Sequence, residues 1–205
     1  MFLKSQPTLV LASTSIYRRA LLERLGLRFE SIAPALDETP RAGEAGLELV
    51  ARLARAKAGG IAAARPDAWV IGSDQVAVLQ VEGMQERILG KPGHIAACIE
   101  QLTAASGRTL LFLTAVALVR SRAAASLERI EFIDTTRVKF RALDRAAIER
   151  YVAHDAPLDL AGGFKSEALG IALCESIESG DPSALIGLPL IRLAAALRGA
   201  GFEIP

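Results

Sequence analysis

One segment near the N-terminus constrains the fold of this chain most, because it predicts a strand that runs directly into a helix. Residues 8–12 are mostly apolar, residues 13–15 all carry a hydroxyl group, and Gly26 closes a predicted helix over 16–25. An apolar strand followed at once by a helix is typical of proteins that cover a sheet with helices. The chain is therefore expected to be an α/β protein.

The turn between this strand and this helix is a candidate phosphate site. N–H groups at the start of a helix lack partners within the helix and carry a partial positive charge, so they bind anions. Ser13 and the two hydroxyl residues after it add donors, and Arg18 and Arg19 follow in the first helical turn. A guanidinium group binds two phosphate oxygens at once. The alternative is an ordinary capped helix whose arginines lie in solvent.

Strand and helix patterns alternate along the rest of the chain without a long linker. The further predicted strands are 29–33, 69–79, 87–89, 109–120, 127–141 and 170–177, and the further helices are 44–64, 94–105, 145–153 and 189–198. Gly83 predicts a hairpin between 69–79 and 87–89, and 109–120 is expected to pair antiparallel with 127–141. Gly59 and Gly60 each cost a helix about 1 kcal/mol relative to alanine, so fraying or a break is expected there. The predicted fold is a mixed, twisted sheet flanked by helices.

Asp74 is the most unusual acidic residue, because it interrupts an apolar strand immediately after Gly72 and Ser73. A carboxylate is costly to bury unless it is paired or bound to a metal, so Asp74 is a candidate functional residue. The alternative is a turn aspartate at the end of a strand. Glu38, in the acidic turn 36–41, is a second candidate, and a solvated loop acid is the alternative reading of it.

Several motifs occur in the order and spacing of a known family, namely LASTSIYRRALLERLG, APALDETPR, VARLARAKA, VIGSDQV, ILGKP and AGGFKSEALGIAL. From about residue 9 to residue 202 the chain resembles the Maf family of nucleoside triphosphate pyrophosphatases. The resemblance implies a single domain over residues 1–205 that resembles inosine triphosphatases, with two lobes and a nucleotide cleft between them. It also implies hydrolysis of a nucleoside triphosphate to a nucleoside monophosphate and pyrophosphate. The DETPR, SDQV and FKSE sequences look like the branch that hydrolyses 7-methyl-GTP.

The resemblance also implies roles for individual residues. The residues expected to bind the substrate phosphates are Ser13, Arg18, Lys57 and Lys91. For Lys57, the alternative is a lysine on a solvated helix face. Asp74 is implied to be the general base that activates water. A divalent cation, Mg²⁺ or Mn²⁺, is the expected cofactor, because Mg²⁺ prefers one or two carboxylates together with phosphate and water. Glu38 and Asp74 are the candidate ligands of this cation, and Asp37 is expected to cap the turn or to support the ligands without contacting the metal. For Asp74, the roles of general base and of metal ligand both stay open.

Three residues are expected to recognise the base. Methylation at N7 makes guanine cationic, and a cation over an aromatic face is stabilised by about 0.5–2 kcal/mol, which suits Tyr17. The N1–H and N2–H₂ edge of guanine donates twice, which suits the carboxylate of Glu167, and Gln75 beside Asp74 is the third candidate. The alternatives are that Tyr17 lies in the core and that Glu167 pairs with Lys165.

Composition and charge argue against several other classes of function. The formal net charge is +1, so no broad basic surface for nucleic acid is expected. The cysteines (Cys98, Cys174) and histidines (His94, His154) lack the spacing of a disulfide framework or a metal site. The start of the chain lacks the apolar core of a signal peptide, and the longest apolar run, 109–119, is too short to span a bilayer. A cytoplasmic protein is expected, with a nucleotide as partner, no nucleic acid or membrane partner, and a homodimer left open.

Two alternative functions stay open. One is the branch of the same family that hydrolyses dTTP and UTP. The other is a non-catalytic nucleotide-binding regulator of cell division, against which the joint presence of Asp74, Glu38, Lys57 and Lys91 argues.

Overall fold

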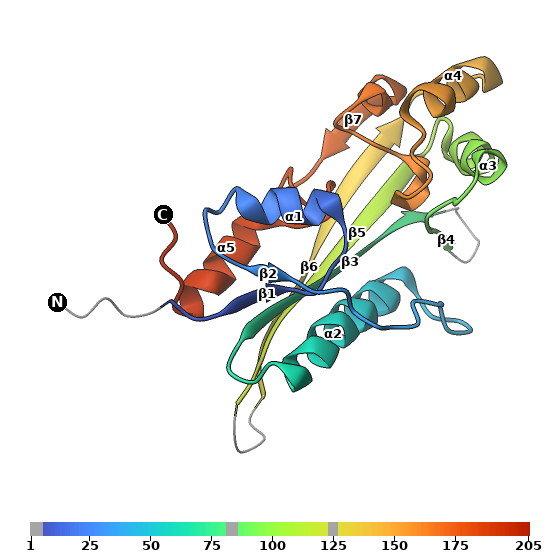
Figure 1. The fold of residues 1–205 in the computed structure, drawn as a ribbon. Helices are drawn as coiled ribbons and strands as arrows, with labels where there is room; N and C mark the ends of the chain where they lie inside the picture. Colours follow the sequence, from blue (N-terminus) through green and yellow to red (C-terminus); the bar gives the residue numbers. More distant parts are fainter. Residues whose placement is uncertain (1–5, 81–85, 123–126) are drawn as a thin grey trace.

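The computed structural model describes residues 6–80, 86–122 and 127–205, which form an α/β structure around one sheet (Figure 1). Its strands are β1 (Leu9–Leu11), β2 (Glu30–Ser31), β3 (Trp69–Leu79), β4 (Arg87–Leu89), β5 (Thr109–Ser121), β6 (Leu127–Phe140) and β7 (Cys174–Glu178). Its helices are α1 (Ile16–Glu23), α2 (Gly46–Ala64), α3 (Ile95–Ala105), α4 (Arg145–Asp155) and α5 (Leu190–Gly199), with the short 3₁₀ helices η1 (Ala161–Gly163) and η2 (Leu169–Leu173).

Seven strands of the described chain form one mixed sheet in the order β2-β1-β3-β5-β6-β7, and β4 pairs with β3. β1 runs parallel to β2 and to β3, whereas the other pairs are antiparallel. The two long runs pair as expected, because β5 and β6 stay in register from Thr109 opposite Lys139 to Ser121 opposite Leu127. The mixed sheet flanked by helices that the sequence predicts is therefore confirmed.

Strand β3 has a gap along one of its two edges. On one edge β5 pairs with nearly its whole length, from residue 70 to residue 79. On the other edge β1 pairs only with residues 69–71 and β4 only with residues 77–79. Within the described ranges, the middle of β3 therefore has no strand beside it on this edge, and the candidate site lies there.

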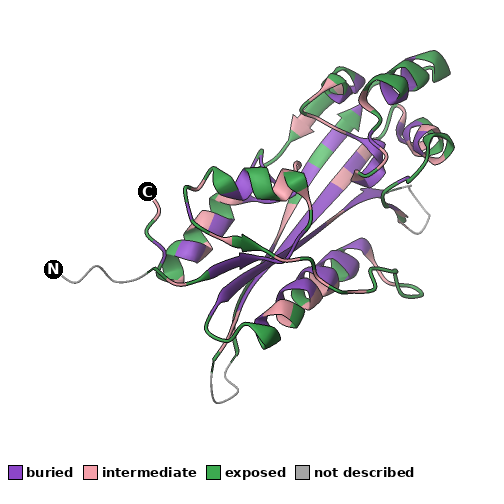
Figure 2. Cartoon of the chain, in the orientation of Figure 1, coloured by how far each residue is buried: buried purple, intermediate pink, exposed green. Residues whose placement is uncertain are grey.

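Side chains of β3 alternate between the two faces of the sheet, as the two-residue period of a strand requires. Val70 and Val76 pack with α2 on one face. On the other face, Ile71 packs with α1 and α5, whereas Ala77 packs with α3 and α4 further along the strand. Figure 2 shows the buried residues along the strands and on the inner sides of these helices. The second face thus carries two separate groups of helices, which correspond to the two expected lobes.

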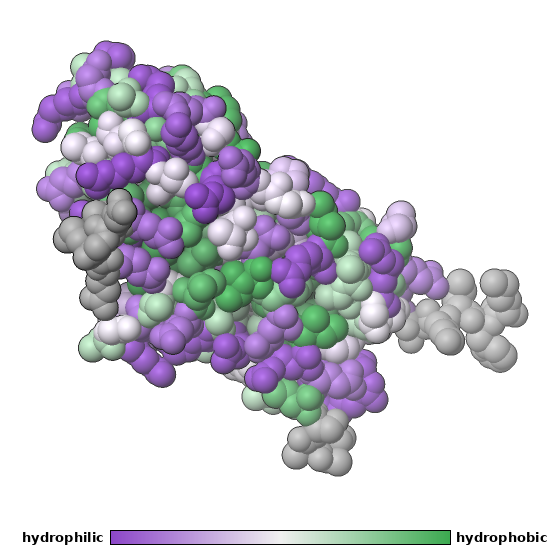
Figure 3. Space-filling model, turned by 180° about the vertical axis from the view of Figure 1, so that it is seen from behind, coloured by the Kyte–Doolittle hydropathy of each residue, from purple (hydrophilic) through white to green (hydrophobic). Residues whose placement is uncertain are grey.

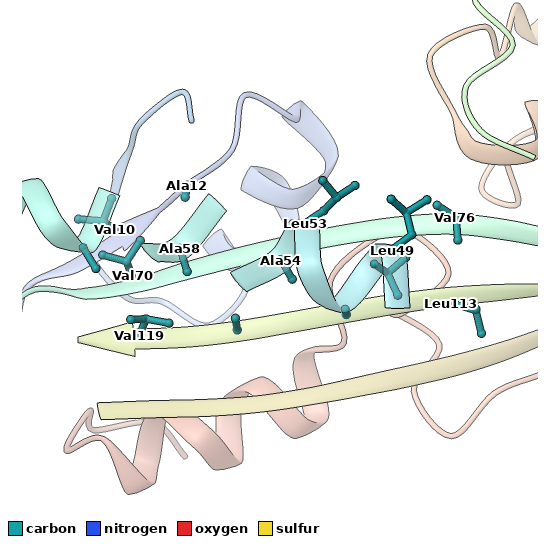
Figure 4. Close-up of a cluster of buried hydrophobic side chains, with 14 of the residues drawn as sticks. Val10, Ala12, Leu49, Leu53, Ala54, Ala58, Val70, Val76, Leu113 and Val119 are labelled. Atoms are coloured by element: carbon teal, nitrogen blue, oxygen red, sulfur yellow. The ribbon is translucent and has the colours of Figure 1, made fainter. Parts of the chain in front are cut away.

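Helix α2 lies close to β3 because small residues form the contact. Ala54 and Ala58 face the sheet from the helix (Figure 4), and Gly72 lies opposite them on the strand. A Cβ atom at Gly72 would lie 2.2 Å from the carbonyl oxygen of Ala54 and 2.6 Å from the amide nitrogen of Ala58. Both distances are far below van der Waals contact, so a larger residue would push the helix away from the strand. This close approach brings Lys57 of α2 beside Asp74 of β3.

Helix α2 continues through Gly59 and Gly60 to Ala64, so the expectation that it frays or breaks there was wrong. Its apolar face packs on the sheet through residues such as Val50 and Leu53, and this packing outweighs the low helix propensity of two glycines. The hairpin turn predicted at Gly83 lies outside the described residues, although the antiparallel pairing of β3 with β4 is present.

The last strand begins later than the sequence pattern indicates. Residues 169–173 form the 3₁₀ helix η2, and β7 starts only at Cys174 rather than at residue 170. Gly170 is buried there against the segment before it, because a Cβ atom would lie 2.3 Å from the carbonyl oxygen of Lys165. The Gly170 N–H also donates to the carboxylate of Asp155 at 3.3 Å. Neither contact leaves a periodic signal in the sequence, so the apolar pattern alone predicts a strand.

The surface seen from behind mixes hydrophilic and hydrophobic residues, with a hydrophobic patch near its middle (Figure 3). The most exposed large apolar side chains come from several different elements: Ile16, Ile95, Leu127, Ile171 and Ile191. Within the described ranges, every helix is too short or too polar to serve as a membrane-spanning segment.

Candidate active site

A cleft of about 350 Å³ opens where β1 ends and α1 begins. One group of lining residues, 12–18, forms the turn between these two elements, and a second group, Lys91 and residues 159–161, follows β4 and α4. The predicted site residues that line the cleft are Ser13, Tyr17, Arg18, Glu38, Lys57, Gln75 and Lys91. The structure therefore brings together residues that are separated by up to 78 positions between Ser13 and Lys91.

The turn between β1 and α1 is shaped by its own hydroxyl groups. Ser15 is the N-cap of α1, and its Oγ accepts a hydrogen bond from the backbone N–H of Arg18 at 3.3 Å. The Oγ of Ser13 accepts from the backbone N–H of Ser15 at 3.1 Å. These bonds satisfy N–H groups that the helix leaves free, so the hydroxyls act first as caps. The first turn of the helix, with its partial positive charge, lines the cleft.

The two arginines of this turn have different environments. Arg19 is exposed and pairs with Glu23 at 3.1 Å, so the alternative of a solvated arginine holds for this residue. Arg18 lines the cleft, and its Nε donates a hydrogen bond to the carbonyl oxygen of Gly187 at 2.9 Å. Burial lowers the pKa of Arg18, and the negative charges of nearby Asp74 and Glu38 act in the opposite direction. Arg18 is therefore the arginine placed to bind an anion.

Lys57 connects the two candidate carboxylates of the site. Its Nζ lies 2.6 Å from Oδ1 of Asp74 and 2.8 Å from Oε1 of Glu38. Lys57 is 5% exposed and Asp74 is 6% exposed, whereas half of the Glu38 side chain is accessible. Lys57 thus lies on the buried face of α2, and its interpretation as part of a solvated helix face was wrong.

Positive charge keeps the Glu38 carboxyl ionised. Burial raises the pKa of this group, but the hydrogen bond from Lys57 and the charges of Lys57, Lys91 and Arg18 outweigh burial and lower the pKa overall. Glu38 is therefore a carboxylate at neutral pH. Asp74 is not among the residues that line the cleft, and it is linked to the lining through Lys57.

The neighbours of Asp74 on β3 point to the opposite face of the sheet and bind a C-terminal loop. The Oγ of Ser73 donates to the carbonyl oxygen of Gly187 at 3.1 Å. The Nε2 of Gln75 has acceptors in Thr114 Oγ1 and in the carbonyl oxygens of residues 184 and 185, all within 2.9–3.0 Å. Because these acceptors occupy the amide nitrogen, the amide oxygen of Gln75 is the group left for a ligand, and it accepts hydrogen bonds.

The remaining predicted residues are placed less directly. Tyr17 lines the cleft, so the alternative that it lies in the core was wrong. Glu167 is exposed, lies outside the cleft lining, and accepts a hydrogen bond from the Oγ of Ser166 at 2.8 Å. The Nζ of Lys165 lies over the Tyr17 ring instead of pairing with Glu167. Asp37 is exposed, and hydrogen bonds from Thr39 lower its pKa, in agreement with a capping role.

A loop that no sequence pattern indicates completes the cleft. Asp181 is 2% exposed, and it accepts hydrogen bonds from the backbone N–H groups of Ser183 and Ile191 at 2.9 and 2.7 Å. This loop carries the carbonyl groups that bind Arg18, Ser73 and Gln75, and its Ile186 lines the cleft. The Gly-Asp-Pro sequence before it is a turn signal, but it does not indicate the distant partners.

Glu38 and Asp74 are the residues that fit a divalent cation. In the part of the chain that the structure describes, no three His, Cys, Asp or Glu residues are grouped closely enough to form a metal site. Mg²⁺, however, binds with one or two carboxylates when phosphate oxygens and water complete its shell. Two carboxylates that share one ammonium group match that donor set.

The fold and the site together define an α/β protein with a cation-lined cleft suited to an anionic ligand. A family model described as Maf-like protein matches residues 8–200, and the chain belongs to this family. The chain is 51% identical over 199 residues to a 7-methyl-GTP pyrophosphatase of Xanthomonas oryzae pv. oryzae, with 97% of this chain and 100% of the relative covered.

Two further proteins are similar to this chain. A 7-methyl-GTP pyrophosphatase of Pseudomonas aeruginosa is 49% identical over 199 residues, with 97% of this chain and 100% of the relative covered. Among solved structures, a nucleoside-triphosphatase or dITP/XTP pyrophosphatase of Mycobacterium abscessus is 15% identical, with 95% of both chains covered and a TM-score of 0.42.

Proposed function

We propose that this protein hydrolyses 7-methyl-GTP at the α–β phosphoanhydride to 7-methyl-GMP and pyrophosphate. The observation that carries this proposal is the Glu38–Lys57–Asp74 cluster, in which Lys57 and Asp74 are buried, beside a cleft that Arg18 and Lys91 also line. A nucleoside triphosphate carries up to four negative charges, and these cations can neutralise them. The names of the two relatives, which are about half identical over nearly the full chain, support 7-methyl-GTP as the substrate.

In the proposed mechanism, the phosphates lie against the first turn of α1, Arg18 and Lys91. Water adds to one phosphorus of the anhydride, the P–O bond to the bridging oxygen breaks, and the bond's electron pair leaves with that oxygen. Asp74 orients the water or accepts its proton, and Lys57 holds Asp74 in place. A bound divalent cation, Mg²⁺ or Mn²⁺, would be held by Glu38 and Asp74 and would neutralise phosphate charge.

A nucleotide panel tests this proposal. The full chain is incubated with 7-methyl-GTP, GTP, dTTP and UTP, each with Mg²⁺, with Mn²⁺ and with a chelator, and the products are separated by anion exchange. The expected result is pyrophosphate and a nucleoside monophosphate, formed fastest from 7-methyl-GTP and only with a metal. Release of single phosphate groups would contradict the reaction, and faster turnover of dTTP or UTP would favour the other branch.

Asp74→Asn tests the residue at the centre of the mechanism. This variant keeps the size of the side chain and removes its charge, so kcat is expected to fall by at least about 100-fold. Asp67→Asn is the matched control, because Asp67 is exposed and asparagine tolerates its positive φ of 67°. Near wild-type turnover by Asp74→Asn would remove Asp74 from the mechanism.

A further inference from the structure

The ammonium group of Lys165 lies over the aromatic ring of Tyr17, which lines the cleft. The Nζ of Lys165 is 5.8 Å from the centroid of the Tyr17 ring, within the range of a cation–π contact. Among the described residues, no carboxylate forms an ion pair with Lys165, and nearby Glu167 accepts from Ser166 instead. Lys165 is half-buried and is not itself a lining residue of the cleft, but its Nζ lies over Tyr17, which is one. Within the described ranges, its three N–H donors make no hydrogen bond to the protein, so they are free to bind a ligand at the Tyr17 ring.

Backbone contacts fix the position from which this side chain extends. The backbone N–H of Lys165 donates to the phenolic oxygen of Tyr151 at 2.9 Å, and Tyr151 is 1% exposed. The carbonyl oxygen of Lys165 packs against Gly170, at a position where only glycine fits. Lys165 therefore extends from a rigid point after η1 to Tyr17 on α1, and it joins the two groups of elements that line the cleft.

Tyr17 and Lys165 offer complementary groups to a nucleotide base. An aromatic ring in a cleft can stack on any nucleotide base, because every base has a π face. An ammonium group donates hydrogen bonds and accepts none, so beside a stacked base it binds a carbonyl oxygen and rejects an amino group. The cations Arg18, Lys57 and Lys91 already line the cleft for phosphate, which leaves Lys165 at the ring for the base.

We propose that Lys165 is a specificity-determining residue that donates a hydrogen bond to the 6-oxo group of a purine stacked on Tyr17. It thereby favours 6-oxopurine nucleotides over 6-aminopurine nucleotides. This inference rests on the proposed function in one respect, namely that the cleft holds a nucleotide base. It does not depend on turnover or on the identity of the preferred triphosphate.

The test compares two ligands that differ at the 6-position while both carry a 2-amino group. The α,β-methylene analogues of GTP and of 2,6-diaminopurine riboside triphosphate cannot be split at the α–β bond, so calorimetry measures their binding alone. Wild-type protein is compared with Lys165→Met, which keeps the aliphatic stem, and with Lys165→Arg, which keeps a cationic donor. Lys139→Met is the matched control, because Lys139 lies on β6 and pairs with Glu175.

Lys165→Met is expected to lower the affinity ratio of the 6-oxo to the 6-amino ligand by about 10-fold or more, the range for a hydrogen bond to a charged group. Lys165→Arg is expected to keep most of the ratio, and Lys139→Met all of it. Equal loss of affinity for both ligands would place Lys165 at the phosphates and overturn the proposal. An unchanged ratio, or a wild-type protein that binds neither ligand, would overturn it as well. Because no turnover is measured, these outcomes are distinct from a failure of the proposed reaction.

Discussion

The ammonium nitrogen of Lys57 lies 2.6 Å from a carboxylate oxygen of Asp74, in the contact between α2 and β3. Both side chains are less than 10% exposed, so each charge has lost most of its hydration. Removing one member of such a pair leaves the other charge buried without compensation, which is strongly destabilising. The same ammonium group contacts Glu38 at 2.8 Å, so one lysine holds both carboxylates that the reaction is proposed to use.

Lys57→Met is therefore expected to affect both stability and turnover. The free energy of unfolding should fall by about 3 kcal/mol, because Asp74 loses its partner in a buried site. kcat should fall by at least about 100-fold, because Asp74 and Glu38 lose the group that positions them. Urea denaturation and steady-state kinetics on 7-methyl-GTP measure these effects. Arg55→Met on the same helix is the control, since its pair with Glu131 is half exposed and both quantities should stay near wild type.

A second prediction concerns Gly72, which lies in the contact between α2 and β3, and compares it with Gly60, which does not. Gly72→Ala should lower the free energy of unfolding by about 1–3 kcal/mol, because the new Cβ atom would overlap the backbone of Ala54 and Ala58. It should also lower kcat, since the displaced helix carries Lys57 away from Asp74. Gly60→Ala is the same chemical change at an exposed helical position with open space, and it should stabilise by about 0.5–1 kcal/mol. Equal unfolding midpoints for the two variants would contradict this account.

The sequence predicts most of the fold because its strongest signals are local. The apolar runs that became β3 and β5, and the turn that Gly26 closes with a φ of +67°, are readable from neighbouring residues. The same locality limits the prediction. Nothing near residue 170 in the sequence shows that the N–H of Gly170 donates to Asp155 of α4, so the pattern predicts a strand where the chain forms a 3₁₀ helix.

In the candidate site, too, the residues that belong to short local motifs could be predicted, whereas those that depend on distant contacts could not. Arg18 follows a hydroxyl-rich turn and Lys91 lies in a Gly-Lys-Pro turn, so both could be predicted from short patterns. The sequence does not indicate that Asp159 and the loop around Asp181 line the cleft, because their positions depend on contacts with residues far away in the chain. That Lys165 pairs with no carboxylate of the described residues could not be foreseen either, since Glu167, two residues along the chain, offered a simpler partner.

A third prediction separates cations that bind phosphate from cations that lie in solvent. Arg18→Met and Lys91→Met should each lower kcat/KM by about 10-fold or more for every nucleotide, because charged hydrogen bonds to phosphate are lost. The ranking of substrates should not change, since all of them share the triphosphate. Arg19→Met is the control at the neighbouring position, where the side chain is exposed and paired with Glu23. A changed ranking with high overall activity would reassign Arg18 or Lys91 to the base.

A fourth prediction concerns Glu167, which is exposed and lies outside the cleft lining. We expect the two oxygens of its carboxylate to accept hydrogen bonds from N1–H and N2–H₂ of 7-methylguanine. Glu167→Gln replaces one of these oxygens by an NH₂ group, which then faces an N–H group of the base and cannot bond to it. A mismatch of this kind costs about 1–3 kcal/mol, which corresponds to about a 5- to 150-fold loss in kcat/KM. Thymine and uracil present both a donor and an acceptor to an amide, so their triphosphates should lose less.

The measurement for Glu167 is the ratio of kcat/KM for 7-methyl-GTP to that for dTTP and UTP, in wild type and in Glu167→Gln. Glu175→Gln is the matched control, because Glu175 lies on β7, pairs with Lys139 and is half exposed. Its ratio should equal that of wild type. A ratio that is also unchanged in Glu167→Gln would show that this carboxylate stays at Ser166 and does not read the base. Recognition of the purine edge would then rest on the amide oxygen of Gln75 and on Lys165, and Lys165→Met tests the second of these.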